Sequence, residues 1–82
     1  MDEVHFVVEQ AGCTSCAARI GNALEKIGTV HEIEVDEVAD VVVVRLSASV
    51  SEEAVNDVLR QASEGAGHGY RVQLGSWGGA RS

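Results

Sequence analysis

The sequence predicts an α+β fold in which two helices cover one face of a four-stranded antiparallel sheet. Three observations lead to this prediction: two segments with the apolar period of a helix, four short segments typical of strands, and the order in which they alternate. The order is strand, helix, strand, strand, helix, strand. This is the split βαβ arrangement of ferredoxin-like folds.

The first strand and the first helix follow from a change of period along the chain. Residues 4–8 place apolar side chains at every second position, which indicates a strand with one apolar face. Over residues 14–27 the apolar positions recur at i, i+3, i+4 and i+7, the stripe of an amphipathic helix. We expect Thr14 or Ser15 to cap the start of this helix and Gly28 to end it.

A hairpin and a second helix follow. Residues 30–36 and 41–46 indicate two strands, and the short polar turn between them makes them a hairpin. Ser49 and Ser51 precede two glutamates, a helix-start signature that places acids in the first turn. The second apolar stripe is expected to run to about Glu64, before a glycine-rich break.

The end of the chain predicts a fourth strand at residues 70–74, followed by a glycine-rich stretch without a pattern. A chain of 82 residues has room for one core. We therefore expect one domain over residues 1–76 and a flexible C-terminal tail over residues 77–82. Nothing in the sequence assigns a place to Trp77.

Composition and charge exclude several classes of function. The net charge of −7, with only one Phe, one Trp and one Tyr, argues against a nucleic-acid-binding module and against anionic membranes. No apolar run approaches the roughly 20 residues needed to span a bilayer. The N-terminus is acidic and lacks a secretory signal, so we expect a cytoplasmic protein without membrane insertion.

The chemistry-bearing motif is Cys13-x-x-Cys16 at the entrance of the first helix. In a reducing compartment this spacing favours metal ligands or a redox pair over a structural disulfide. Cys16 falls in the first helical turn, where the helix dipole favours a thiolate. One alternative is a redox pair of the thioredoxin type, although that fold relies on a cis-proline and this chain has no proline. Another is a pair of small buried hydrophobic residues.

A wider set of residues surrounds the pair in a recognisable order: Val8, Cys13, Cys16, Ile20, Leu24, Val30, Ile33, Val35, Asp36, Val50, Ser51, Glu53, Gly69 and Tyr70. With them the chain resembles the heavy-metal-associated domain family over about residues 4–74. This family comprises small copper chaperones and the N-terminal metal-binding domains of metal-transporting P-type ATPases.

The resemblance implies a function and partners. It implies a non-enzymatic, monomeric protein that binds a soft metal ion with Cys13 and Cys16 and transfers it by thiolate exchange. The partner would be a metal-transporting P-type ATPase or another metal-exchange protein. A thiol–disulfide redox module, or an interaction domain whose cysteines are incidental, are the alternative functions.

Two departures from the family pattern concern the site. The family's Gly-Met before the first cysteine is Gln10-Ala11 here, so a smaller side chain fills the place under the loop. About six extra residues precede Gly69-Tyr70, and they include His68. His68 is therefore a candidate third ligand, with a solvated loop histidine as the alternative.

The choice of metal rests on the donor set. Two soft sulfurs suit copper(I), whereas zinc prefers four ligands. Zinc-handling relatives often carry a carboxylate directly before the first cysteine, where this chain has Gly12. We therefore expect copper(I), with zinc, cadmium or mercury as alternatives. His5 and His31 are expected to be solvated.

Overall fold

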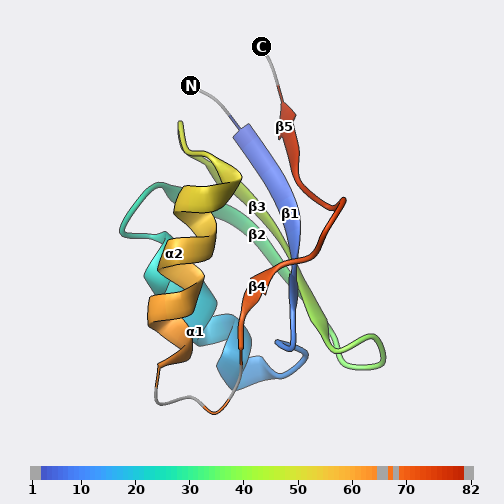
Figure 1. The fold of residues 1–82 in the computed structure, drawn as a ribbon. Helices are drawn as coiled ribbons and strands as arrows, with labels where there is room; N and C mark the ends of the chain where they lie inside the picture. The colour runs from blue at the N-terminus through green and yellow to red at the C-terminus, as the bar shows by residue number, and fades with distance from the viewer. Residues whose placement is uncertain (1–2, 65–66, 68, 81–82) are drawn as a thin grey trace.

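The computed structural model describes residues 3–64, 67 and 69–80 (Figure 1). Its elements are β1 (Glu3–Glu9), α1 (Thr14–Leu24), β2 (Thr29–Asp36), β3 (Val41–Ser47), α2 (Glu52–Ser63), β4 (Arg71–Val72) and β5 (Gly78–Ala80). The first six appear in the order βαββαβ, so the predicted ferredoxin-like fold is confirmed.

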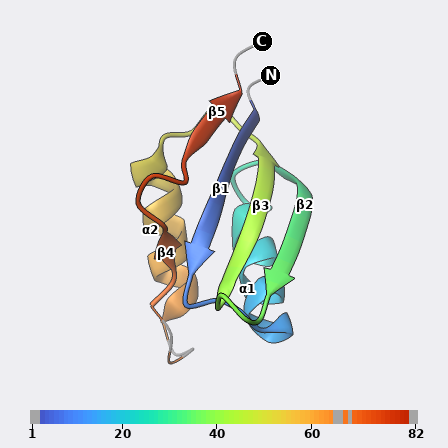
Figure 2. The ribbon, with the colours of Figure 1, turned by 90° about the vertical axis from the view of Figure 1, so that its right-hand side faces the viewer.

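The sheet is antiparallel throughout and has the order β2-β3-β1-β4. Both helices lie on one face of it, and no helix of the described residues covers the other face (Figures 1 and 2). Because β1 and β2 run in the same direction, the β1–α1 loop, the β2–β3 turn and the start of β4 gather at one end of the molecule (Figure 1). That end carries the cysteine pair.

The core lies between the helices and the sheet. Side chains alternate along β1 and β3, so that every second one is buried against α1 and α2. The largest fully buried side chains come from four elements: Phe6, Ile20, Leu24, Leu46 and Leu59. The apolar side chains that recur with the strand and helix periods of the sequence therefore pack together in one apolar layer.

The first helix ends three residues earlier than the apolar stripe predicts. It stops at Leu24, and the chain then tightens: the Ile27 N–H donates to the Leu24 carbonyl at 3.0 Å, a three-residue spacing. Gly28 has a packing role here. A Cβ on Gly28 would lie 2.5 Å from the Ser47 carbonyl oxygen and 2.6 Å from the Ala48 Cβ. Glycine therefore lets the chain pass close to the end of β3.

The second helix matches its prediction closely. Ser51 is the N-cap, and its hydroxyl accepts a hydrogen bond from the Ala54 N–H at 3.1 Å. Glu64 is the C-cap. Asn56 on this helix also accepts a bond from the Val72 N–H at 2.8 Å, which ties α2 to β4.

The glycine-rich end departs from its prediction. Residues 70–74 were expected to form a strand, but β4 holds only Arg71 and Val72. After the Gln73 N–H donates to the Val7 carbonyl at 2.8 Å, the chain turns outward through Gly75, whose φ is +81°. The Ser76 hydroxyl then accepts from the Val7 N–H at 3.1 Å, in place of a strand partner.

The expectation of a tail without regular structure is wrong for Gly78–Ala80. These residues form β5, which pairs with Glu3–His5 of β1 and continues the edge that β4 begins (Figure 2). Gly78 lies under the imidazole of His5, where a Cβ would collide with the ring. Small residues thus allow the strand to pack closely against β1, although their β-propensity is low.

Candidate metal centre

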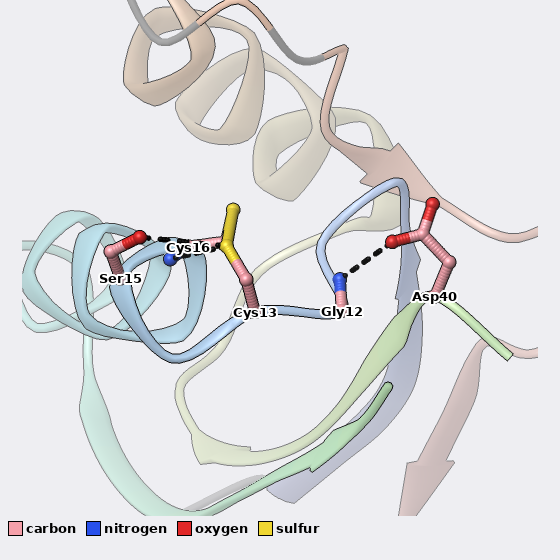
Figure 3. Close-up of a disulfide and its surroundings, with 5 residues drawn as sticks. All are labelled: Gly12, Cys13, Ser15, Cys16 and Asp40. Atoms are coloured by element: carbon pink, nitrogen blue, oxygen red, sulfur yellow. Dashed lines mark hydrogen bonds between the residues drawn. A yellow bond between two sulfur atoms is a disulfide. The ribbon is translucent and has the colours of Figure 1, made fainter. Parts of the chain in front are cut away.

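Cys13 and Cys16 lie next to each other at the start of α1 and are joined by a disulfide (Figure 3). Their Cα atoms are 5.2 Å apart. The structure therefore presents the oxidised form of the pair. Reduction by two electrons would release two sulfurs that are already adjacent, and two thiolates are the donors that soft metal ions prefer.

The N-cap of α1 is Cys13, rather than the expected Thr14 or Ser15. Its backbone is extended, and its sulfur accepts a hydrogen bond from the Cys16 N–H at 3.3 Å. The Ser15 hydroxyl lies 3.5 Å from the same sulfur. The first helical turn thus directs N–H and O–H groups toward Cys13 Sγ, an arrangement that stabilises negative charge on the sulfur.

The two cysteines differ in exposure. Cys16 is only 3% exposed and belongs to the apolar core, whereas Cys13 is half-buried at its edge. Cys16 alone would fit the reading of a small buried hydrophobic residue, but Cys13 does not. An incoming ligand would reach the pair from the side of Cys13.

The segment before the pair, residues 10–13, is called the cysteine loop here. Ala11 within it is fully buried and fills the place beneath the loop. Gln10 has a left-handed backbone, with φ +58°, although it is not a glycine. Its side-chain Oε1 accepts a hydrogen bond from the Gly69 N–H at 3.3 Å. The loop is thereby joined to the segment that leads into β4.

The β2–β3 turn contacts the cysteine loop from the other side. The Gly12 N–H donates to Asp40 Oδ1 at 3.0 Å, and the Ala11 N–H donates to the Asp40 carbonyl at 3.2 Å (Figure 3). Sequence reasoning missed Asp40. The glycine at position 12 was the one available signal, because a Cβ there would lie 2.5 Å from the Asp40 Cα.

Of the remaining candidate residues, His68 lies outside the described residues. His5 and His31 are exposed on the sheet, and His31 Nε2 forms a hydrogen bond with the Ser47 hydroxyl at 2.6 Å. Tyr70, beside the loop's contact at Gly69, is 3% exposed and belongs to the core.

Within residues 3–64, 67 and 69–80, no group of three His, Cys, Asp or Glu side chains is placed to hold a metal ion. The described part of the chain therefore offers a two-sulfur site. Such a site suits copper(I) and leaves zinc short of its usual four ligands.

Comparison with known families places the chain in a family. The model of the heavy-metal-associated domain matches residues 5–68, most of the chain. The chain belongs to the heavy-metal-associated domain family. Membership supports metal binding and transfer as its function.

Solved structures agree with this assignment. A structure described as "Crosstalk between Cu(I) and Zn(II) homeostasis" has a TM-score of 0.57 and 25% identity, with 84% of this chain and 97% of that chain covered. Oxidised MerP from Ralstonia metallidurans has a TM-score of 0.55 and 19% identity, covering 88% and 99%. The yeast copper transporter domain Ccc2a has a TM-score of 0.54 and 17% identity, covering 88% and 94%.

The last two likenesses, below 25% identity, show the fold of the heavy-metal-associated domain. A search of curated protein sequences gives no match. None of the helices in the described ranges has the length and apolar character that crossing a membrane requires.

Proposed function

We propose that this heavy-metal-associated domain binds one copper(I) ion with the thiolates of Cys13 and Cys16 and passes it to a partner protein. The observation that carries the proposal is the site itself: two adjacent sulfurs at a helix start, with no third metal-binding side chain among the described residues. Copper(I) accepts two or three thiolate ligands, whereas zinc prefers four.

The difference in exposure between the cysteines supports transfer as well as binding. A partner's thiolate would attack the metal from the side of Cys13, which is half-buried, rather than Cys16, which is 3% exposed. A three-coordinate intermediate would form, and each cysteine of this chain would leave as a partner sulfur replaces it. One metal–sulfur bond forms before another breaks, so the ion always keeps at least two sulfur ligands and no step requires its full release.

Binding requires the reduced pair. A dithiol reductant must first supply two electrons to open the disulfide, and the proposal therefore places the working protein in a reducing compartment such as the cytoplasm. The net charge of −7 favours a partner with a basic docking surface. A metal-transporting P-type ATPase or another thiol-bearing metal-exchange protein fits this role.

The experiment is an anaerobic titration of the reduced chain with copper(I) in competition with a colorimetric chelator. We expect one ion per chain. Cys13→Ser and Cys16→Ser should each weaken binding more than the roughly 10- to 100-fold typical of losing an outer contact, because each removes a ligand. Ala18→Ser, which adds a hydroxyl to an exposed position of the same helix, should bind as the parent does.

The outcome separates this function from its alternatives. If the Cys13→Ser/Cys16→Ser double variant binds copper(I) as tightly as the parent, the site is elsewhere. The disulfide in the structure supports a second candidate, a thiol–disulfide redox module. That function predicts exchange with a dithiol partner and no tight metal binding by the reduced pair.

A further inference from the structure

A single residue of the β2–β3 turn is bonded to the cysteine loop through two successive peptide N–H groups. Asp40 accepts the Ala11 N–H with its backbone carbonyl at 3.2 Å and the Gly12 N–H with Oδ1 at 3.0 Å. Ala11 and Gly12 are the two residues directly before Cys13. The contact joins segments 28 residues apart in the sequence.

Both sides of this contact are shaped for close approach. A Cβ on Gly12 would lie 2.5 Å from the Asp40 Cα and 2.9 Å from its carbonyl carbon, so only glycine fits there. Asp40 has a left-handed backbone, with φ +59°, and presents both its carbonyl oxygen and its Oδ1 to the loop. Asp36 Oδ1 accepts the Ala39 N–H at 3.0 Å and closes the turn.

The contact continues to the metal-binding sulfur through the backbone. The Cys13 N–H donates to the Ala11 carbonyl at 2.8 Å, and Cys13 Sγ accepts the Cys16 N–H at 3.3 Å. The position of Cys13 Sγ therefore depends on the positions of Ala11 and Gly12. Asp40 fixes both residues through its two hydrogen bonds.

We propose that Asp40 is a positioning residue of the metal site, which fixes the cysteine loop so that Cys13 and Cys16 stay adjacent for one metal ion. This inference rests on the proposed function. Asp40 acts through Gly12 and is not a ligand: Figure 3 shows its carboxylate bonded to Gly12, apart from Cys13 Sγ, and it forms no metal-binding group with the two cysteines.

The role requires an acceptor oxygen at this place, not a charge. An asparagine at position 40 presents an amide oxygen that can accept the same Gly12 N–H. A glycine removes the side-chain oxygen that accepts the Gly12 N–H, and it keeps the backbone carbonyl. Because glycine adopts φ +59° without steric cost, the turn itself is kept. Glu37 lies in the same turn, is exposed, and makes no hydrogen bond with the cysteine loop within the described residues. Glu37→Gln is therefore the control for removing one negative charge.

The first measurement is copper(I) affinity of the reduced chain. Asp40→Gly should lower it about tenfold, the scale of losing a contact that orients a ligand, while Asp40→Asn and Glu37→Gln should stay within about twofold of the parent. Gly12→Ala tests the contact from the other side, because its methyl group would force the turn away from the loop, and it should also lower affinity. Equal affinity of Asp40→Gly and the parent, or equal losses for Asp40→Gly and Asp40→Asn, would overturn the proposal.

The second measurement needs no metal. The equilibrium between the Cys13–Cys16 disulfide and its dithiol form, set against a glutathione buffer, reports how often the two sulfurs meet. Asp40→Gly should shift it about tenfold toward the dithiol, and Asp40→Asn should restore it. If this shift occurs but the parent binds no copper(I), the proposed function fails and the positioning role stands. If the equilibrium does not move, the positioning role fails whatever the metal affinity.

Discussion

The indole ring of Trp77 stacks on the phenyl ring of Phe6, with centroids 5.3 Å apart and an interplanar angle of 18°. Phe6 is 1% exposed at the centre of β1, and Trp77 packs against the edge of the same core. The stack joins the end of the chain to the first strand. It also places Gly78–Ala80 beside β1, where they complete the edge that β4 leaves open.

We predict that Trp77→Ala lowers the free energy of unfolding by about 2 kcal/mol, because it removes an aromatic stack and part of the core boundary. Urea denaturation measures this, and hydrogen exchange should show faster amide exchange in Glu3–His5. Leu74→Ala is the control, since Leu74 is 87% exposed and its loss should cost less than about 0.5 kcal/mol. Equal costs for the two variants would show that the stack does not anchor β5.

This stack marks the limit of what the sequence predicts about the fold. The apolar periods predict the βαββαβ core because burial alternates with the same periods. The strand at Gly78–Ala80 has no such period, and its stability comes from the distant contacts of Trp77 with Phe6 and of Gly78 with His5. The pattern of residues within one segment does not predict contacts with residues some 70 positions away in the sequence.

The candidate site likewise has a part that the sequence predicts and a part that it does not. The spacing of Cys13 and Cys16 and their place at a helix start follow from local sequence. Asp40 does not, because it reaches the cysteine loop only after β2 and β3 have folded into a hairpin. From the sequence, Gly12 indicates only that no carboxylate stands before Cys13. In the structure its lack of a side chain lets Asp40 approach the backbone of the cysteine loop.

The backbone of Gln10 leads to a second prediction. At φ +58° a side chain costs about 1 kcal/mol relative to glycine, and Gln10 offsets part of this with its bond to Gly69. Both Gln10→Gly and Gln10→Ala lose that bond, but only glycine relieves the strain. Gln10→Gly should therefore be more stable than Gln10→Ala by about 1 kcal/mol in urea denaturation. Equal stabilities would mean that residue 10 is not held in the left-handed region in solution.

A third prediction concerns two glycines, one within α1 and one just after its end. Gly28→Ala should destabilise the fold by about 2 kcal/mol, because its methyl would overlap the Ser47 carbonyl and the Ala48 side chain. Gly21→Ala is the matched variant. Its methyl meets only the terminal Cδ1 of Ile33, at 3.0 Å, which can move aside, and alanine favours a helix by about 1 kcal/mol. Thermal unfolding should therefore show a lower midpoint for the first variant than for the second, and the reverse order would contradict the packing at β3.

The last prediction concerns His68, which lies outside the described residues. The motive comes from its neighbour in the chain: the Gly69 N–H is bonded to Gln10 of the cysteine loop at 3.3 Å. An imidazole is a good ligand for copper and zinc, and a third ligand matters more to zinc, which two sulfurs satisfy poorly.

A ligand role for His68 predicts that His68→Ala lowers copper(I) affinity about tenfold, the scale of a lost supporting contact, and zinc affinity by more. The charge-transfer spectrum of a cobalt or mercury probe should change as well, since it reports the ligands around the metal. His31→Ala is the control, because His31 is bonded to Ser47 at the end of β3 opposite the turn that meets the cysteine loop. Unchanged affinities and spectra for His68→Ala would leave Cys13 and Cys16 as the whole site, and the preference for copper(I) over zinc would then rest on the two sulfurs alone.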